Sequence, residues 1–476
     1  MNFFINGEWV PSLSGRMIPV RNPATGEVID TVPAGDAADA DRAVRAAHAA
    51  FPGWRARPMA ERAKLQHAAA AEMRKRIDQL AHSLTLEMGR PLAGARTELE
   101  RSAELLDYFA EEGLRLTGDL PLLNLPDERV LVVKEPVGVV VAIPPFNYPI
   151  TLLTFKLGPA LITGCTVVAK PATETPLTTL RLAQIFHDAG FPPGVLNVVT
   201  GHGREIGQAL IEHPIPRKIS FTGGVATGKR IAAAAAQTNK RLTLELGGQC
   251  PAIVCDDADL DVALPALLKQ TFDNSGQFCY RVNRMYVQRG IFDTFTERFA
   301  AAARKLTVGN GLQPGCQMGP LVNEATMRKS EEHVRDALAK GARLLAGGER
   351  LTGAEFDRGY FWPPTVLTHT HHSMLIMTEE TFGPVVGLMP IETLAEAIAC
   401  ANDTPYGLAA FIFTKNLAHA WRAAERCEAG SVWVNNIHRS YNQVPFGGYK
   451  ESGLGREKSR YGLEEYLELK TIYLSL

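Results

Sequence analysis

The chain has 476 residues, of which 46% are hydrophobic and 21% charged, and its formal net charge is -1 at pH 7. A chain of this length and composition can bury one large core or two ordinary ones, and we expect two domains with a small appendage. Because the charge is nearly balanced, the sequence lacks the basic surface typical of proteins that bind nucleic acids or anionic membranes, so small molecules and further copies of the chain are the expected partners.

The first part of the chain is predicted to be helical and the next part to alternate. Helical spacing of apolar residues among Ala, Leu, Arg and Glu predicts helices at 36–50, 55–88 and 97–112. Strands are then predicted at 129–133, 138–143, 166–169, 195–199, 218–221 and 242–246, with helices at 177–188, 204–212 and 227–236. Short strands joined by helices predict a parallel, doubly wound sheet.

A second alternating block follows, from 251 to about 434. Its predicted strands are 284–287, 385–389, 410–413 and 431–434. The expected fold class is therefore α/β, with two doubly wound domains in series. The weakly alternating segment 464–475 is too short for a domain and is expected to pair with an edge strand of this chain or of a neighbouring subunit.

The sequence shows neither a targeting signal nor a metal motif. Residues 1–9 carry no basic stretch followed by an apolar run, and no apolar run is long enough for a bilayer. The seven scattered cysteines include no Cys-x-x-Cys pair. We expect reduced thiols, a cytoplasmic protein, no membrane association and no metal site.

Three glycine-rich segments compete for a nucleotide-binding role. In the segment 201–207 the third glycine, Gly207, comes one residue late for the common dinucleotide fingerprint. The segment 223–229 nearly matches a phosphate-binding loop, but Arg230 stands where that loop needs a hydroxyl, which excludes a nucleoside triphosphatase. In Thr-Gly-Gly at 222–224, a strand meets a helix and small residues let backbone amides approach a pyrophosphate. A plain strand-helix turn is the alternative.

Two further segments predict chemistry. Glu245 lies in Leu-Glu-Leu-Gly-Gly at 244–248, and Cys279 ends Ser-Gly-Gln-Phe-Cys at 275–279. A thiol nucleophile together with a carboxylate that can activate water suits a reaction in which a covalent thioester forms and is then hydrolysed. The sequence therefore predicts an enzyme.

Seven motifs in order resemble those of the aldehyde dehydrogenase superfamily, and the resemblance runs essentially from end to end. They are Pro-Phe-Asn-Tyr-Pro at 145–149, Val-Ala-Lys-Pro at 168–171, Phe-Thr-Gly-Gly at 221–224, Leu-Glu-Leu-Gly-Gly at 244–248, Gly-Gln-Phe-Cys at 276–279, Glu-Glu-Thr-Phe-Gly-Pro at 379–384 and Pro-Phe-Gly-Gly at 445–448. The resemblance implies a Rossmann-like nucleotide-binding domain (1–117 and 137–247), a catalytic domain (248–448) and a small β oligomerisation element (118–136 and 449–476) in a homodimer or homotetramer.

The resemblance also implies catalytic roles. Cys279 matches the nucleophile that attacks the aldehyde, and Asn147 matches a side-chain donor to the oxyanion, with the Cys279 backbone amide as the second donor. Glu245 matches the base that activates water, so the expected product is a free acid.

The implied cofactor is NAD or NADP. Lys170 is similar to the residue that binds the adenosine ribose, Glu380 to the one that binds the nicotinamide ribose, and Phe382 to the ring beside the nicotinamide. Many members that use NAD carry an acid where this chain has Thr173, so the missing repulsion predicts that NADP is accepted, although Glu174 follows directly. The remaining cofactor contacts are assigned to Gly207, Thr222, Gly223, Gly224 and Gly247.

The substrate is expected to be an apolar or aromatic aldehyde, with a semialdehyde as the alternative. Residues 445–469 are similar to those of succinate-semialdehyde dehydrogenases, which bind the distal carboxylate with arginines. Phe155 and Asp273 stand at the corresponding positions here, and an acid there repels an anion. Aromatic residues near the motifs are assigned to the pocket, with ordinary core packing as the alternative: Phe146, Tyr148, Phe155, Phe278, Tyr280 and Phe446.

Three other functions compete with this one. An enzyme that passes the thioester to coenzyme A usually lacks the carboxylate that Glu245 provides. A relative without catalysis would be expected to have lost Cys279, Glu245 or Asn147, and all three are present. A cysteine hydrolase would need a histidine close to Cys279, and none of the motifs supplies one.

Overall fold

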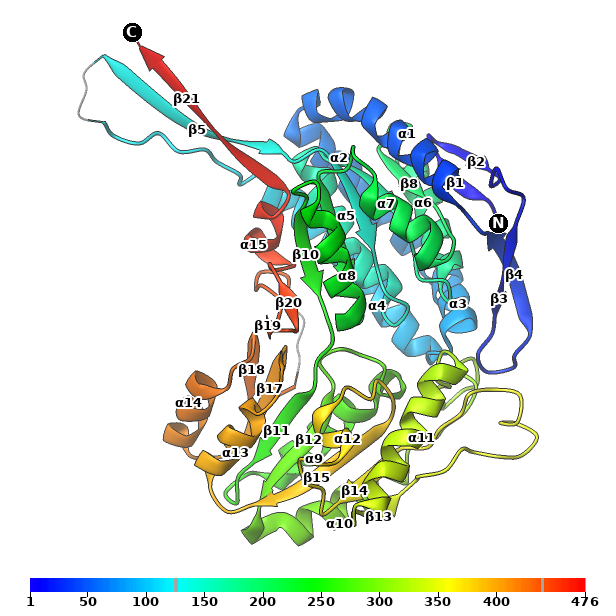
Figure 1. Ribbon diagram of the computed structural model, residues 1–476, viewed down its shortest axis with the longest axis vertical. Helices are drawn as coiled ribbons and strands as arrows, with labels where there is room; N and C mark the ends of the chain where they lie inside the picture. Colours follow the sequence, from blue (N-terminus) through cyan, green and yellow to red (C-terminus); the bar gives the residue numbers. More distant parts are fainter. Residues whose placement is uncertain (124–126, 438–440, 476) are drawn as a thin grey trace.

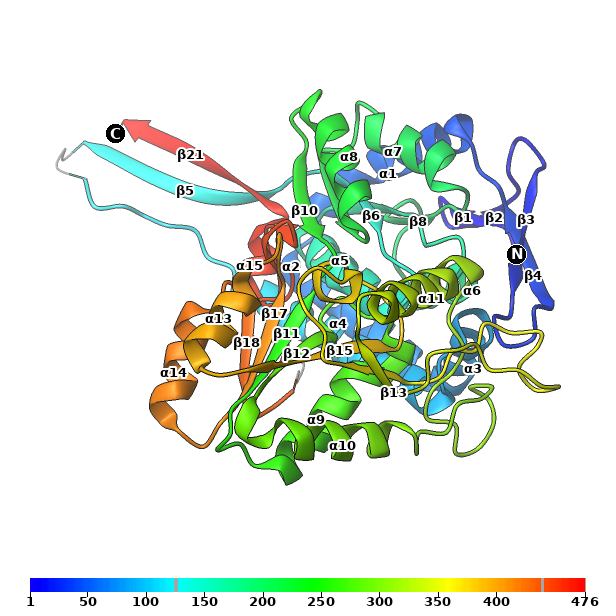
Figure 2. The ribbon, with the colours of Figure 1, turned by 60° about the horizontal axis from the view of Figure 1, so that its bottom comes forward.

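The computed structural model describes residues 1–123, 127–437 and 441–475, and it contains two large sheets with helices on both sides of each (Figure 1). The first sheet lies in the upper half of Figure 1 and the second in the lower half, and Figure 2 shows the same two halves from another side. Both sheets are mostly parallel. The predicted class, two α/β units in series, is confirmed.

The first sheet has eight strands, and its five central strands are parallel. Their spatial order is β2 (Glu8–Val10), β1 (Phe3–Ile5), β8 (Leu196–Val198), β7 (Thr166–Ala169), β6 (Val139–Ile143), β9 (Lys218–Thr222), β10 (Arg241–Glu245) and β20 (Gly453–Leu454). The chain winds outward from β6 through β7 to β8, and then returns to lay β9 and β10 on the other side of β6. The crevice beyond the carboxyl ends of β6 and β9 is thus the switch point at which such sheets bind ligands.

Helices cover both faces of this sheet because its buried strands carry apolar residues on both sides. In β6, Val139, Val141 and Ile143 pack in one core cluster, while Val140 and Ala142 pack in another. The first cluster is covered by α1 (Ala37–Ala56), α7 (Gln208–Glu212) and α8 (Val225–Ala236). The second is covered by α2 (Met59–Lys75), α3 (Ile77–Met88), α4 (Leu92–Gly113), α5 (Pro149–Thr163) and α6 (Pro176–Asp188).

The second sheet has seven strands and is likewise covered by helices on both faces. Their order is β13 (Arg343–Ala346), β14 (Thr365–Thr368), β15 (Val385–Ile391), β12 (Val282–Gln288), β11 (Cys250–Val254), β17 (Ala409–Phe413) and β18 (Ser431–Val434). One face packs on α9 (Leu260–Phe272) and α10 (Phe292–Ala303), and the other on α11 (Glu324–Ala339), α12 (Leu375–Thr378), α13 (Leu394–Asn402) and α14 (Leu417–Arg426). The amino ends of β11, β12 and β15 follow the segments that hold the predicted site residues Gly247, Cys279 and Phe382.

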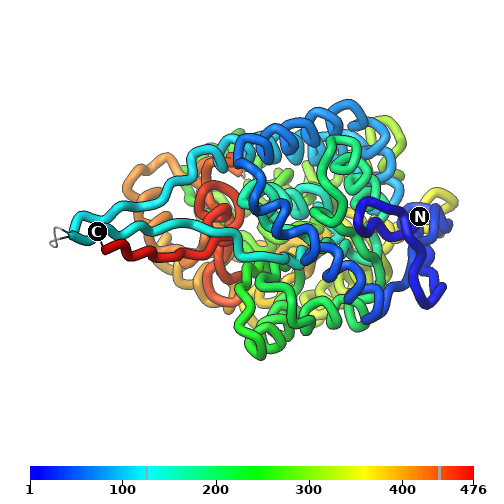
Figure 3. The backbone as a smooth tube through the Cα atoms, turned by 90° about the horizontal axis from the view of Figure 1, so that it is seen from above, coloured from blue at the N-terminus to red at the C-terminus, as the bar shows by residue number. Residues whose placement is uncertain are grey.

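A long ribbon projects from the body of the molecule (Figure 3). It is formed by β5 (Glu128–Pro136) and β21 (Leu467–Ser475), which pair antiparallel along nine residues each. The predicted C-terminal strand therefore finds its partner within the chain. Between β18 and β21, β19 (Tyr449–Lys450) pairs with β16 (Tyr406–Gly407), β20 joins the first sheet, and α15 (Ser459–Glu464) contacts α4 and α5. The domain boundaries and the oligomerisation role stay predictions, and residues 124–126 and 476 lie outside the described part.

Some elements differ from the predicted ones. The helix predicted at 55–88 is divided, because Arg57 precedes Pro58 and takes an extended conformation (ψ 135°), and a second break falls at Arg76. The segment 204–212 begins as a π-helix at Gly203–Gly207. The hairpins β1–β2 and β3–β4 (Met17–Arg21 and Val28–Pro33) were not predicted: β1 and β2 have only three residues each, and β3 contains Pro19, a residue that argues against a strand. No helix in the described part is long and apolar enough to cross a membrane.

Candidate active site

Two cavities meet at Cys279, between the carboxyl edge of the first sheet and the amino edge of the second. The larger has a volume of about 440 Å³ and the smaller about 320 Å³. Cys279 and Asn147 line both, while Glu245, at the end of β10, lines the larger one. The structure thus brings the three predicted catalytic residues together from three separate segments.

The larger cavity is lined by every residue that the sequence assigned to the cofactor: Lys170, Thr173, Gly207, Thr222, Gly223, Gly224, Gly247, Glu380 and Phe382. It lies at the switch point beyond β6 and β9. Lys170 is buried, its Nζ donates to the Pro171 carbonyl at 2.9 Å, and burial lowers its pKa to about 8. Glu174 also lines this cavity, and its Oε1 accepts from Asn323 Nδ2 at 3.3 Å.

The smaller cavity contains five of the six aromatic residues assigned to the substrate pocket: Tyr148, Phe155, Phe278, Tyr280 and Phe446. The Tyr280 ring lies edge-on to those of Phe278 and Phe446, at centroid distances of 5.2 and 5.7 Å. The structure places Phe146 apart from these five residues. Its side chain lines the larger cavity, 5.7 Å from the Phe382 ring, because Asn147 and Tyr148 carry the chain from one cavity to the other.

Sequence reasoning missed the cations of the smaller cavity. Arg101 on α4, Lys269 on α9 and Lys458 just before α15 all line it, together with Asp273. The two other charged residues of the lining, Arg90 and Glu98, form an ion pair with each other. Among the described residues of the lining, three cations therefore stand against one remaining acid. No local motif links these positions, which lie far apart in the chain.

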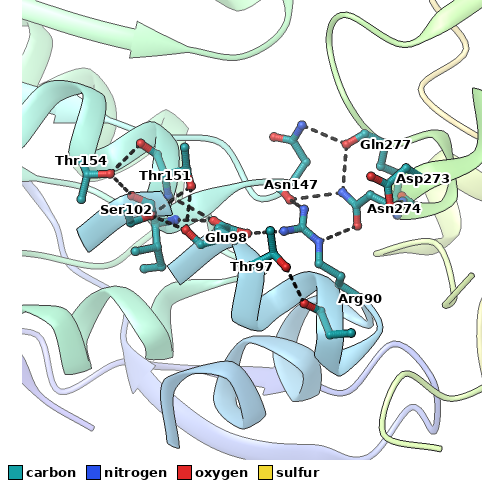
Figure 4. Close-up of polar contacts among 12 residues, drawn as sticks. Arg90, Thr97, Glu98, Ser102, Asn147, Thr151, Thr154, Asp273, Asn274 and Gln277 are labelled. Carbon is teal, nitrogen blue, oxygen red and sulfur yellow. Dashed lines mark hydrogen bonds and ion pairs between the residues drawn. The ribbon is translucent and has the colours of Figure 1, made fainter. Parts of the chain in front are cut away.

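Arg90 connects three segments that line the site (Figure 4). Its guanidinium is 3% exposed, forms an ion pair with Glu98, and donates to the Asn147 carbonyl and, at 3.1 Å, to Asn274 Oδ1. Glu98 Oε1 in turn accepts from the backbone amides of Ile150 and Thr151 at the start of α5. One buried ion pair thus connects α4, the loop before α5 and the loop that carries Cys279.

The loop before Cys279 is held in a special conformation. Asn274 and Ser275 have positive φ angles of 52° and 59°, and Gly276 follows at 70°. An added Cβ at Gly276 would come within 2.4 Å of the Gly383 carbonyl oxygen, so only glycine fits there. Ser275 Oγ donates to the Gly319 carbonyl at 2.8 Å.

The Asn147 side chain points at this loop. Its Nδ2 donates to the Gln277 carbonyl at 2.9 Å, and the same carbonyl accepts from Asn274 Nδ2 at 3.2 Å (Figure 4). A carboxamide nitrogen carries two hydrogens, so one remains for a group that sits near Cys279.

Glu245 lies in an unusual electrostatic setting. Within the described residues, neither of its buried oxygens accepts a hydrogen bond. Burial raises its pKa well above the usual range, and the charge of Glu457 raises it further. Glu457 is itself bound by Lys156, whose Nζ lies 2.6 Å from Glu457 Oε1 and 2.7 Å from Thr222 Oγ1. A carboxyl group with a raised pKa takes up a proton more readily than an ordinary carboxyl group, which suits a general base.

Cys279 is similarly shielded. Burial raises the pKa of its thiol well above the usual range, and the nearby Glu245 carboxylate raises it further. Burial therefore disfavours the thiolate, which is the form of the sulfur that attacks carbon. The neighbouring Cys250 donates its S–H to the Cys279 carbonyl at 3.6 Å and stays a buried thiol whose pKa burial raises to about 12.

Comparison with known proteins agrees with this geometry. The sequence pattern of the aldehyde dehydrogenase family matches residues 9–472. The chain is 44% identical to a glutarate-semialdehyde dehydrogenase of Pseudomonas putida, over 99% of this chain and 97% of that one. Identity to an NADP⁺ succinate-semialdehyde dehydrogenase of Escherichia coli is also 44%, with the same coverage. A crystal structure of betaine aldehyde dehydrogenase from Staphylococcus aureus with NAD⁺ superimposes with a TM-score of 0.98 at 39% identity, covering 100% of this chain and 95% of that one.

The Arg90–Glu98 pair gives a testable stability effect. Arg90→Met leaves the Glu98 carboxylate buried without its cation, which costs about 3 to 5 kcal/mol in comparable pairs. The urea midpoint and the thermal unfolding temperature should fall clearly. The double variant Arg90→Met/Glu98→Met removes the orphaned charge and should recover a large part of the loss. If the double variant loses as much free energy of unfolding as the two single variants lose in sum, the pair does not act as a unit.

Proposed function

The chain belongs to the aldehyde dehydrogenase family, and on that premise we propose that it oxidises a semialdehyde, an aldehyde with a distal anionic group, to the free acid with NAD or NADP. The observation that carries the proposal is the position of Cys279, which lines both a glycine-lined cavity and a cation-rich one. An aldehyde in the smaller cavity and a hydride acceptor in the larger one can both reach the thiol.

The larger cavity fits a nicotinamide dinucleotide. Among the described residues, no atom beyond its chain neighbours lies within 4 Å of an added Cβ at Gly224, so the surface over Thr222–Gly224 and the start of α8 is open to a pyrophosphate. Lys170 and Glu380 supply polar groups for the two riboses. Glu380 Oε1 accepts from the Gly248 amide at 2.9 Å, and an added Cβ at Gly247 would lie 2.5 Å from Glu380 Oε2. Bound there, the dinucleotide supplies the acceptor for the hydride of the aldehyde carbon.

Cys279 forms the covalent bond. Its Sγ attacks the aldehyde carbon, the thiol proton passes to solvent water, and the former carbonyl oxygen becomes an oxyanion. The second hydrogen of Asn147 Nδ2 and the Cys279 backbone amide are the donors proposed to stabilise that oxyanion. Oxidation of the carbon leaves an acyl group on Cys279 as a thioester.

Glu245 then directs hydrolysis. Its two oxygens lie buried at the end of β10 and accept no hydrogen bond from the described residues, so they can bind a water beside the thioester. Proton transfer from that water to the carboxylate makes the hydroxide that attacks the acyl carbon and releases the acid and the thiolate. An added Cβ at Gly447 would come within 2.7 Å of Glu245 Oε1, so a glycine at this position leaves room for the Glu245 carboxylate.

A semialdehyde is a better substrate proposal than the apolar or aromatic aldehyde that the sequence favoured. Two of the relatives are named for semialdehydes. Phe155 and Asp273 line the smaller cavity, as their assigned positions suggested, but Arg101, Lys269 and Lys458 bring positive charge from other segments. The aromatic rings fit the carbon chain between the anion and the aldehyde.

We also propose that the β5–β21 ribbon joins copies of the chain. It exposes apolar side chains far from either core, including Leu469 (69% exposed) and Tyr473 (75%). Asp119 bridges to Val132 on the outer edge of β5, while among the described residues no further strand pairs with β21, so a second copy can cover that edge.

The proposed function has a direct assay. Purified protein with 5-oxopentanoate and NAD or NADP should release reduced cofactor and glutarate in equal amounts, and coenzyme A should change neither yield. The Cys279→Ala variant should bind the cofactor in a fluorescence titration but turn over less than about a hundredth as fast. Formation of glutaryl-coenzyme A, or faster turnover in this variant, would contradict the mechanism.

Cofactor choice depends on Thr173 and Glu174. Thr173→Glu adds a carboxylate beside Lys170, and repulsion of a 2'-phosphate should lower kcat/KM with NADP at least about tenfold relative to NAD, or roughly 1.4 kcal/mol. Glu174→Gln removes an acid from the same cavity wall and should shift the ratio the other way. An NADP/NAD ratio that neither variant changes would show that these residues lie away from the ribose.

A further inference from the structure

Lys458 combines burial, positive charge and backbone strain in the smaller cavity. It is 2% exposed, lines the cavity that also reaches Cys279, and directly precedes α15. Its φ of 63° and ψ of 172° lie in a region that glycine adopts readily and other residues rarely adopt. A strained residue that persists at a site indicates that its side chain is used there.

A second cation lines the same space. Burial lowers the pKa of Lys458 to about 8, and the positive charge of Arg101 is the next largest cause. Two cations on the walls of one cavity repel each other, and an anion placed between them removes that repulsion. Lys458 Nζ also lies 5.8 Å from the centre of the Phe155 ring, which places it beside the aromatic wall.

The preceding residue belongs to a different part of the site. Glu457 Oε1 is bound by Lys156, and the Glu457 carboxylate acts on Glu245 beneath the larger cavity. The two consecutive side chains therefore act at different cavities. The Glu457 carboxylate raises the pKa of Glu245, the proposed base, and Lys458 lines the smaller cavity.

We propose that Lys458 is a specificity residue whose ammonium group, together with the Arg101 guanidinium, binds the distal carboxylate of the aldehyde while its carbonyl carbon lies at Cys279. The inference rests on the proposed function. It accounts for an anionic substrate in a chain that has Phe155 and Asp273 where related enzymes carry arginines, because the positive charge enters from α4 and from the segment before α15.

The test compares two aldehydes of equal length, 5-oxopentanoate and pentanal, which differ in the terminal carboxylate. The quantity measured is the ratio of their kcat/KM values. Lys458→Met keeps the stem and removes the charge, and Lys458→Gly also removes the backbone strain. Both should lower the ratio about 30-fold, mainly because the anionic aldehyde binds less tightly and its Michaelis constant rises while kcat changes little. Lys458→Arg should keep most of the preference, and Arg101→Met should lower it.

Lys415→Met is the matched control, since Lys415 is 66% exposed and lines neither cavity. Inhibition by glutarate gives a binding readout, and this inhibition should weaken in Lys458→Met. A wild-type preference for 5-oxopentanoate that survives in Lys458→Met and Lys458→Gly would overturn this inference but not the proposed semialdehyde function. Equal losses for both aldehydes in Lys458→Gly would do the same, because they indicate a structural role. A wild-type ratio near one would instead overturn the proposed semialdehyde function.

Discussion

A buried guanidinium at the junction of the two sheets determines how the site is assembled. Arg90 sits over the Tyr148 ring at 3.7 Å, forms an ion pair with Glu98 and contacts the Asn147 carbonyl and Asn274. Through Glu98 it also anchors the first amides of α5. A charge this deep is tolerated only when its hydrogen-bonding groups are paired, so the surrounding segments are held in one arrangement. The proposed oxyanion donor and the nucleophile are placed together as a result.

The two sheets supply different parts of the chemistry. The first contributes the switch point beyond β6 and β9, with the glycines that let a dinucleotide come close, and it ends β10 at Glu245. The second contributes Cys279 and Glu380 from the segments that lead into its strands. In the proposed mechanism, the position of Cys279 on both cavities lets the acyl group form on one side and accept water positioned by Glu245 on the other. The raised pKa values of Cys279 and Glu245 have one main cause, the burial of both groups.

Local patterns in the sequence predicted what depends on local geometry. The parallel strands, the glycines at the cofactor cavity and the chemistry of Glu245 and Cys279 all follow from short segments. The break at Pro58 was readable from the residue before a proline. The three-residue strands β1 and β2 carry too few residues for a periodic signal, and Pro19 argues against a strand at β3. Arg90, Arg101 and Lys458 lie beside residues that are distant in the sequence, so no local motif predicts their place in the site. The substrate expectation placed an apolar or aromatic aldehyde ahead of a semialdehyde for the same reason, since it weighed Phe155 and Asp273 without the cations that share their cavity.

The central claim is that Cys279 carries an acyl group that water activated by Glu245 removes. Its most direct test is mass spectrometry of the Glu245→Gln variant, quenched in acid during turnover of 5-oxopentanoate with NAD. Glutamine keeps the shape of the side chain and removes the base, so the account predicts protein heavier by one glutaryl group, with the modification on the peptide that contains Cys279. Unmodified Cys279 during steady turnover, or an adduct on Cys250 instead, would contradict it.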